Sequence, residues 1–321
     1  MVLTVTINPL LEHRLTYSRT VMNEKNREGK LSFAAGGKGI NVCRQLKQLG
    51  VQNIALTFSG GTFGKLFREA IKSEGLDFSL INVSSETRVC PVIIDSGNKK
   101  ASYYFPVNPI IMKEEKEKFI LQMEKMIKNC EIVVFSGSSP CKETEDIFPI
   151  GIEMAKRYDK ISICDTYGNH LKESYYAAPR IIHNNIEEIE SSLSIKLENE
   201  KDKLDFLDSL YNYGIKQTFL TDEANDFYSS NFDFHYKVTV PKIDLVDSTG
   251  SGDSFVAGIA YGWHHNLTFT EQIKFAVALG SANAETFDVA IISKEKAEEL
   301  INLVEVVSVG KKMKIIDDSP H

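Results

Sequence analysis

Short apolar runs rich in β-branched residues alternate with amphipathic stretches along most of the chain, and this alternation restricts the fold more than any other feature. Residues 2–7 (VLTVTI) have the composition of a strand, and residues 39–50 (GINVCRQLKQLG) follow with apolar side chains at helical spacing. The same order returns in residues 53–60 with 64–75, and again in 131–137 with 147–158. Such alternation favours strands joined by crossover helices. We therefore expect an α/β fold with a doubly wound, mostly parallel sheet and helices on both faces.

Two stretches, residues 11–35 and 88–108, interrupt the alternation. They contain strand-like segments (RLTYSRTV, RVCPVIID, ASYYFPV) with no helical pattern between them. We expect these segments to form a small antiparallel β flap that acts as a lid over one edge of the sheet. No composition shift or linker marks a second full domain, so residues 1–310 are predicted to form one α/β domain and residues 311–321 a C-terminal tail.

The charge and the cysteine content narrow the classes of partner and compartment. The chain has 37 basic and 44 acidic residues, a net charge of −7, without long blocks of one sign. This balance argues against a nucleic-acid partner and against a polybasic membrane contact. The five cysteines form no C-x-x-C pair, which is typical of reduced thiols in a cytoplasmic protein. No apolar run approaches the ~18 residues of a membrane span.

The segment DSTGSGDSF, residues 247–255, places two glycines where a loop enters a predicted helix. Free backbone amides and the helix dipole favour an anion at such a helix start. A carboxylate at this point, Asp253, suits phosphoryl transfer, because it can accept a proton while the amides stabilise the moving phosphoryl group. Taken alone, the segment is equally compatible with a turn in which Asp253 only caps the helix.

A second glycine loop, AAGGKGINVCRQL at residues 34–46, also precedes a predicted helix. Lys38 lies between its glycines and offers a point charge for an anion, and Asn41, one turn later, can both donate and accept hydrogen bonds. A tight turn with a solvated lysine is the alternative interpretation of this loop.

Together the two loops resemble the G-G-K-G-x-N and D-T-x-G-x-G-D signatures of the ribokinase-like (PfkB) carbohydrate kinases. Shorter matches in the same order resemble the phosphosugar branch of that family, which contains 1-phosphofructokinase and tagatose-6-phosphate kinase: TINPLLE at 6–12, NR at 26–27, ETR at 86–88, SGSSP at 136–140, DTYG at 165–168 and NNIEE at 184–188. The resemblance extends over nearly the whole chain and implies a ribokinase-like fold.

The resemblance also implies roles for individual residues. Asp253 would be the general base, and the backbone of Gly250, Ser251 and Gly252 would form the anion hole. At the ATP end, Asn185 and Glu188 would organise Mg²⁺ through water, which suits a cation that dehydrates reluctantly. The nucleotide itself would lie along Asn185, Thr221, Gly250, Gly252 and Asn283.

At the sugar end, Glu12, Gly37, Lys38 and Asn41 would bind the hydroxyls of the substrate. Arg88, assisted by Lys38 or Arg27, would bind the phosphate that the sugar already has, because arginine can grip a phosphate with two hydrogen bonds. Family members often pair through their flaps, so the resemblance further implies a homodimer through the β lid.

Several positions depart from the family pattern. Glu12 replaces an aspartate, and Cys90 replaces an asparagine that donates and accepts hydrogen bonds. His183 stands where a lysine is usual, and we expect it to be a packed strand-end residue. Residues 220–226 (LTDEAND) have lost the glycines of an ATP-binding loop. These departures leave the choice of substrate and nucleotide open.

The function implied is transfer of the ATP γ-phosphoryl group to a primary hydroxyl of a ketohexose monophosphate, giving a bisphosphate. Fructose 1-phosphate, tagatose 6-phosphate and fructose 6-phosphate are the candidate substrates. A kinase of an unphosphorylated sugar or nucleoside is one alternative. A nucleotide- or sugar-phosphate-binding sensor with little catalysis, suggested by the altered segments 183–184 and 220–226, is another.

Overall fold

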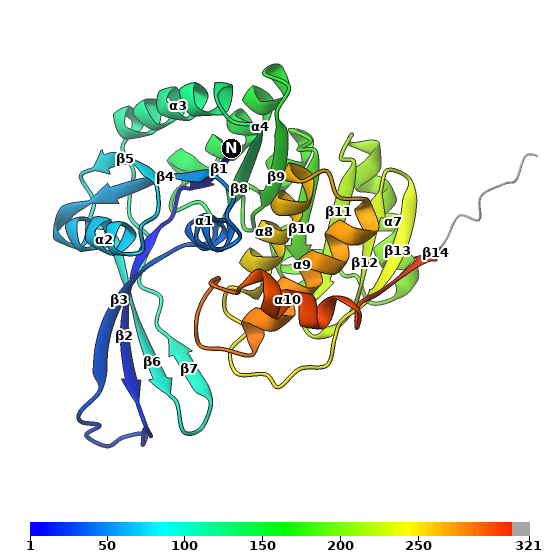
Figure 1. The fold of residues 1–321 in the computed structure, drawn as a ribbon. Coiled ribbons are helices and arrows are strands. Elements are labelled where there is room, and N and C mark those ends of the chain that lie inside the picture. Colours follow the sequence, from blue (N-terminus) through cyan, green and yellow to red (C-terminus); the bar gives the residue numbers. More distant parts are fainter. Residues whose placement is uncertain (310–321) are drawn as a thin grey trace, which may run out of the picture.

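The computed structural model of the protein describes residues 1–309, which are organised around one large sheet (Figure 1). Within these residues the sheet has ten strands in the order β14-β13-β12-β11-β10-β9-β8-β1-β4-β5. The strands are β1 (Val2–Thr6), β4 (Asn53–Gly60), β5 (Phe78–Val83), β8 (Ile132–Ser136), β9 (Ile161–Asp165), β10 (Ile181–Asn185), β11 (Gln217–Asp222), β12 (Asn225–Asn231), β13 (Phe234–Thr239) and β14 (Glu305–Val309). All pairings from β5 to β11 are parallel, and those from β11 to β14 are antiparallel. The predicted mostly parallel sheet is confirmed.

Helices cover both faces of this sheet, as the alternation predicts. They are α1 (Lys38–Gln48), α2 (Gly61–Ser73), α3 (Lys113–Lys128), a 3₁₀ turn η1 (Lys142–Thr144), α4 (Ile147–Arg157), α5 (Leu171–Tyr176), α6 (Ile186–Leu193), α7 (Glu200–Asn212), α8 (Ser251–His264), α9 (Phe269–Ala284) and α10 (Lys294–Ile301). A capping box begins α9: the Thr268 hydroxyl accepts from the Glu271 amide, and the Glu271 carboxylate accepts from the Thr268 amide.

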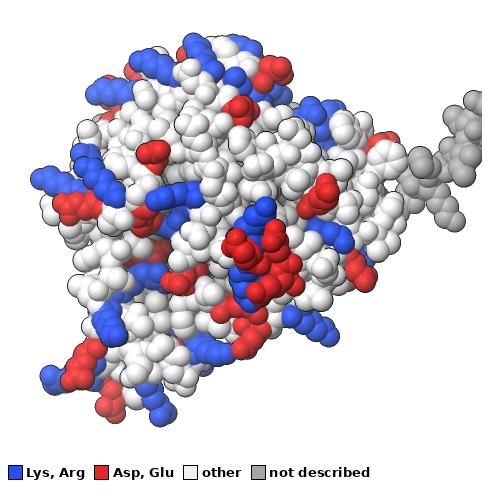
Figure 2. Space-filling view, viewed as in Figure 1, with Lys and Arg blue, Asp and Glu red and all other residues white. Residues whose placement is uncertain are grey.

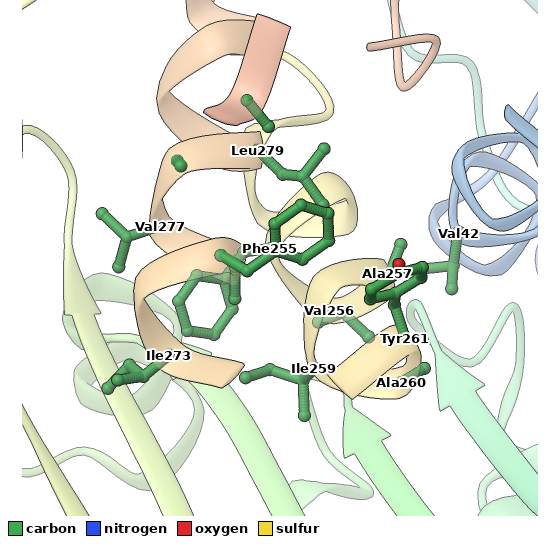
Figure 3. Packing of buried hydrophobic residues seen from close by; sticks show 14 of the residues in the cluster. Val42, Phe255, Val256, Ala257, Ile259, Ala260, Tyr261, Ile273, Val277 and Leu279 are labelled. Atoms are coloured by element: carbon green, nitrogen blue, oxygen red, sulfur yellow. The ribbon is translucent and has the colours of Figure 1, made fainter. Parts of the chain in front are cut away.

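Successive strand residues point to opposite faces, and this divides the core into two large clusters. Val2 packs with α8 and α9 on one face, whereas Leu3 packs with α3 and α4 on the other. Figure 3 shows the first cluster, in which Phe255 and Ile259 of α8 meet Ile273 and Val277 of α9. This packing fixes the start of α8 relative to the carboxyl edge of the sheet.

The small sheet predicted from the interrupted stretches is present, in the order β3-β2-β6-β7. It consists of β2 (Leu10–Tyr17), β3 (Lys30–Gly36), β6 (Arg88–Asp95) and β7 (Lys100–Tyr103), which extend away from the large sheet in Figure 1. The outer pairings are antiparallel, but the central pairing of β2 with β6 is parallel. Both strands follow parallel strands of the large sheet, β1 and β5, and therefore leave its carboxyl edge in the same direction.

On the surface seen in Figure 2, basic and acidic side chains are interspersed and no large single-sign area gathers on this face. Within residues 1–309, no helix combines the length and the apolar character that crossing a membrane requires. The predicted C-terminal tail, residues 311–321, lies outside the described residues.

Candidate active site

A cavity of about 1150 Å³ lies at the carboxyl edge of the large sheet, between the small sheet and the start of α8. Ligands of open parallel sheets bind beyond the carboxyl ends of the strands. Of the residues predicted from the sequence, the cavity wall contains Glu12, Gly37, Lys38, Asn41, Arg88, Asn185, Glu188, Thr221, Gly250, Ser251, Gly252 and Asp253. Arg27 and Asn283 do not line it. The fold thus brings segments from both ends of the chain into one site.

The start of α8 has the geometry of an anion-binding helix terminus. Gly250 is the N-cap with φ 81°, and no side chain caps the helix. A β-carbon at Gly250 would lie 2.5 Å from a methyl group of Val289. Both this close contact and the positive φ angle exclude larger residues at the position. Asp253 is in the first helical turn and is not the capping residue. The interpretation of Asp253 as a simple cap is therefore wrong.

Asn41, in the first turn of α1, holds the Asp253 carboxylate. Its Nδ2 atom donates to Asp253 Oδ2 over 2.7 Å, although the two residues are 212 positions apart. The turn that begins α1 requires Gly37, which has φ 123° and whose β-carbon would approach a Thr6 methyl group to 2.9 Å. The two glycine loops therefore meet at one carboxylate.

The environment of Asp253 suits a general base. The residue is only 5% exposed, and this burial raises its pKa from 3.8 to about 7. Lys38 opposes the rise of the pKa, whereas Asp165 and, less strongly, Glu188 add to it. A base that titrates near neutral pH can accept a proton from a hydroxyl and release it again within the physiological range.

Lys38 lies among carboxylates. Its Nζ atom is 2.6 Å from Glu188 Oε1 and 3.1 Å from Asp165 Oδ1. Burial alone would lower the pKa of Lys38, but Asp165 and Glu188 outweigh it and hold the pKa well above its usual range. From the sequence, Lys38 is expected to bind the sugar and its phosphate; in the structure its ammonium group pairs with Asp165 and Glu188 in the cavity wall, and the sugar-phosphate role stays a prediction.

Asp165, the aspartate of the DTYG segment, was given no role from the sequence alone. It is fully buried at the end of β9 and accepts hydrogen bonds from Ser136 Oγ (2.7 Å) and Lys38. His183 Nδ1 lies 3.1 Å from the same carboxylate. Burial alone would raise the pKa of Asp165, but Lys38 and His183 hold it below the usual range. The sequence signal that could have identified Asp165 is an acidic residue at the carboxyl end of a buried strand.

Asn185 and Glu188 form the capping box of α6, as their N-x-x-E spacing allows. The Glu188 amide donates to Asn185 Oδ1 over 2.7 Å, and the Asn185 amide donates to Glu188 Oε2 over 3.3 Å. Together with Asp165 and Asp253, Glu188 lies around the ammonium group of Lys38. This surplus of oxygen donors with negative charge fits a hard divalent cation. Within the described residues no three acidic, histidine or cysteine side chains converge closely enough to bind a metal directly. The water-mediated Mg²⁺ site at Asn185 and Glu188 stays a prediction.

Arg88 borders the cavity where the small sheet begins. Its guanidinium donates to Asn108 Oδ1 (2.9 Å) and to the Asn8 carbonyl (2.8 Å). The Asn8 side chain in turn donates to Asn108 Oδ1 and to Ser138 Oγ, each over 3.1 Å. These bonds hold the Arg88 side chain at the cavity wall. Asn108 was not singled out from the sequence, because nothing local marks it.

Glu12 and Cys90 lie opposite each other on β2 and β6. Both line the cavity, and Glu12 is only 6% exposed, so it is not the solvated residue that was its alternative interpretation. Burial raises the pKa of Glu12, against the opposing effect of Arg14 and Arg44. Near Arg88 the cavity wall therefore differs from the family pattern: a glutamate stands in place of the shorter aspartate, and a thiol in place of an asparagine amide.

The opposite end of the cavity is more apolar and contains the altered 220–226 segment. Its wall includes Phe227, Val240, Ile243 and Val277, which belong to one hydrophobic cluster. Glu223 adopts φ 48° in the turn between β11 and β12, a conformation in which glycine is usual.

Thr221 at the end of β11 lines the same end of the cavity, with its hydroxyl 3.2 Å from His183 Nε2. His183 is buried, as expected, but it also borders the cavity and links Thr221 to Asp165. It therefore joins the predicted nucleotide-site residue Thr221 to the carboxylate beside Lys38.

Arg27 and Asn283 lie away from the positions predicted for them. Arg27 is exposed in the connection between β2 and β3, outside the cavity of this chain. Asn283 is fully buried, and its amide donates to the Thr249 carbonyl (2.8 Å) and accepts from the Ala290 amide (2.7 Å). Because Asn283 does not reach the cavity wall, we assign it to supporting the loop before α8 instead of contacting the nucleotide.

The small sheet is joined to the loop before α8 and to the segment after α9 through side chains that the sequence pattern does not indicate. Tyr103 of β7 donates to Asp247 Oδ2 over 2.7 Å, and Arg14 of β2 donates to the Phe287 carbonyl over 2.6 Å. Asp247 also accepts from the Thr249 amide (3.0 Å) within the glycine loop. A direct hydrogen bond therefore links the small sheet to the glycine loop that leads into α8.

Residues 12–296 match the model of the pfkB family carbohydrate kinases. The chain is 31% identical over 313 residues to tagatose-6-phosphate kinase of Staphylococcus epidermidis, covering 96% of this chain and 100% of that protein. Its fold matches a possible 1-phosphofructokinase from Thermotoga maritima with a TM-score of 0.88 at 24% identity, covering 97% of this chain and 100% of the other. Phosphofructokinase-2 from Escherichia coli in complex with fructose-6-phosphate matches with a TM-score of 0.82 at 20% identity, covering 94% of this chain and 98% of the other.

The two structural matches show the shared fold, and the sequence matches show descent over nearly the full length. They agree with the order of the motifs and with the position of both glycine loops at one cavity. The protein belongs to the pfkB family of carbohydrate kinases.

Proposed function

We propose that this kinase transfers the γ-phosphoryl group of ATP to a primary hydroxyl of a ketohexose monophosphate and so forms a bisphosphate. The observation that supports this most directly is the placement of Asp253: a buried carboxylate in an uncapped helix start, held by Asn41, within the cavity that also contains Arg88. The relative that acts on tagatose 6-phosphate by its name supports a phosphorylated ketohexose as substrate.

In the proposed reaction Asp253 accepts the proton of the substrate hydroxyl as that oxygen attacks the γ-phosphorus. A new oxygen–phosphorus bond forms, the bond to the bridging oxygen of ATP breaks, and ADP leaves with the electron pair. The amides of Gly250, Ser251 and Gly252 stabilise the charge on the moving group. Catalysis then depends mainly on positioning and electrostatics, as is general for phosphoryl transfer.

The two ends of the cavity suit the two substrates. The apolar wall of Phe227 and Val277 would hold the base of ATP, and Asn185, Thr221 and Glu188 lie toward its phosphates. Glu188 and Asn185 would hold Mg²⁺ through water, and the ion would neutralise phosphate charge. Lys38, beside Glu188, adds the positive charge that the same region needs.

The sugar would lie against Glu12, Gly37 and Asn41, with its phosphate on Arg88. In this proposal Arg88 exchanges its bonds to Asn108 and Asn8 for the phosphate oxygens. Arg27 is omitted from the phosphate site because it lies outside the cavity of this chain.

We further propose that the small sheet acts as a lid and as a dimer contact. Leu31 and Phe33, on its outer strand β3, are 54% and 44% exposed, and such apolar exposure favours a covering partner. Light scattering of the purified protein and of a Leu31→Asp, Phe33→Asp variant would test this: a dimer that becomes a monomer supports it. A wild-type monomer contradicts it. Location in the cytoplasm remains a prediction.

An ADP-release assay tests the main proposal against its alternatives. Fructose 1-phosphate, tagatose 6-phosphate, fructose 6-phosphate, fructose and ribose are each supplied with ATP and Mg²⁺. ADP release with one of the phosphorylated ketohexoses at the highest kcat/KM supports the proposal. Preference for fructose or ribose would instead indicate a kinase of unphosphorylated sugars, and no release with any sugar would favour a sensor.

A further inference from the structure

Asp253 is the end of a chain of hydrogen bonds that starts at the partly buried Glu74, outside the cavity. Glu74 Oε2 accepts from Arg44 Nε over 2.7 Å, and Arg44 Nη1 donates to Asn41 Oδ1 over 2.6 Å. Asn41 Nδ2 then donates to Asp253 Oδ2 over 2.7 Å. Arg44 is 9% exposed and does not line the large cavity, so it does not touch the substrates.

We propose that Arg44 is a positioning residue of the catalytic centre, which fixes the orientation of the Asn41 amide and, through it, the Asp253 carboxylate. An arginine has only hydrogen-bond donors, so the atom of Asn41 that faces it must be the carbonyl oxygen. The amide nitrogen is then turned toward Asp253. In the reverse orientation Asn41 would present its oxygen to a carboxylate and its NH₂ group to a guanidinium, and both contacts would be repulsive.

The same bond determines which oxygen of Asp253 is available. Oδ2 is occupied by Asn41, which leaves Oδ1 for the substrate hydroxyl. Arg44 is itself held on several sides: by Glu74, by the Ala35 carbonyl, and by the Val289 carbonyl at 3.4 Å. Glu74 completes the arrangement by accepting from the Ala35 amide over 2.9 Å. Because these bonds fix the Arg44 guanidinium, it can keep the Asn41 amide in one orientation.

These contacts also join α1 to β3 and to the segment after α9, so loss of Arg44 will lower stability as well. The test must separate the two effects. Gln45, the next residue of α1, is the matched control: it is fully buried and exchanges two hydrogen bonds with the backbone of Ile292 (2.7 and 2.9 Å) without touching Asn41. Gln45→Ala removes a comparable tie of α1 and leaves the chain to Asp253 intact.

The experiment is a double-mutant cycle of Arg44→Gln and Asn41→Ala, with kcat and both KM values measured by ADP release and Tm measured in parallel. We expect Arg44→Gln to lower kcat about 10- to 100-fold with KM changed less, since small misplacement of a reacting group has effects of this size. In the Asn41→Ala background the same change should alter kcat by less than about twofold. Gln45→Ala should lower Tm and keep kcat. Arg44→Lys replaces Arg44→Gln if the latter does not fold.

The inference rests on the proposed function, and the outcomes keep the two apart. A wild-type protein without ADP release contradicts the proposed function and, with it, the role of Arg44. An active wild type combined with additive effects of Arg44→Gln and Asn41→Ala, or with a kcat for Arg44→Gln equal to that of Gln45→Ala, contradicts the positioning role alone.

Discussion

Replacing Asp253 by asparagine should make the protein less active and more stable at the same time. The change keeps the shape of the side chain and removes the group that accepts the proton. Loss of a general base lowers turnover by about 10²–10⁴-fold. We therefore expect kcat of Asp253→Asn to fall at least about 100-fold.

The gain in stability follows from the pKa of Asp253. Burial raises it from 3.8 to about 7, so the folded protein binds this proton more tightly than the unfolded chain does. Ionisation of Asp253 therefore opposes folding: the penalty is absent below about pH 4 and complete above about pH 7. At 1.36 kcal/mol per pH unit, the difference corresponds to at most about 4 kcal/mol. Asparagine has no such penalty.

Thermal unfolding at pH 5 and pH 8, together with the ADP-release assay, measures both effects. The Tm of Asp253→Asn should exceed that of the wild type at pH 8, and the difference should shrink at pH 5. Asp165→Asn is the control with the opposite sign, because the pKa of Asp165 is held below its usual range and its ionised form stabilises the fold. Turnover of Asp253→Asn within tenfold of wild type would refute the catalytic role. A lower Tm at pH 8 would refute the reasoning about burial.

Three further predictions concern pH, the sugar phosphate and substrate choice. Because Asp253 must be unprotonated to act as a base, kcat/KM should fall about tenfold per unit below pH 7; a flat profile from pH 5 to 8 would contradict this. Arg88→Ala should raise KM for the sugar phosphate about 10-fold or more and leave KM for ATP within about twofold, whereas equal increases would remove Arg88 from the phosphate site. Glu12→Asp, one methylene shorter, should change the ratio of kcat/KM between two ketohexose phosphates by about 10-fold; an unchanged ratio would show that Glu12 does not select the substrate.

Much of the fold and the centre of the site could be predicted because both depend on local backbone requirements. The alternation of strands and helices is a pattern of neighbouring residues, and it predicted the large sheet and the helices on its faces. Gly37 and Gly250 mark backbone conformations that other residues avoid, and each precedes a helix start. Lys38 and Asp253 lie within these loops, so the loops identified them as well.

Only the tertiary structure determined which groups these residues meet. Lys38 pairs with Asp165 and Glu188, which are 127 and 150 positions away, and no spacing along the chain predicts those contacts. Asn283 has the same polar side chain whether it binds a nucleotide or supports a loop, and its burial distinguishes the two roles. Arg44 of α1 has a charged side chain that is typical of a solvated helix face, yet this side chain is buried against β3 and the segment after α9.

The sequence alone determined the chemistry available to this protein: an anion-binding helix start with an acid in its first turn, and a second glycine loop with a lysine and an amide. Both follow from the conformations that glycine permits and from the dipole of a helix. The tertiary structure decided how these groups act together, because burial sets the pKa of Asp253 and long-range packing supplies its hydrogen-bond partner. Asn41 and Asp253 are 212 positions apart, and only the packing of the sheet and helices brings them together.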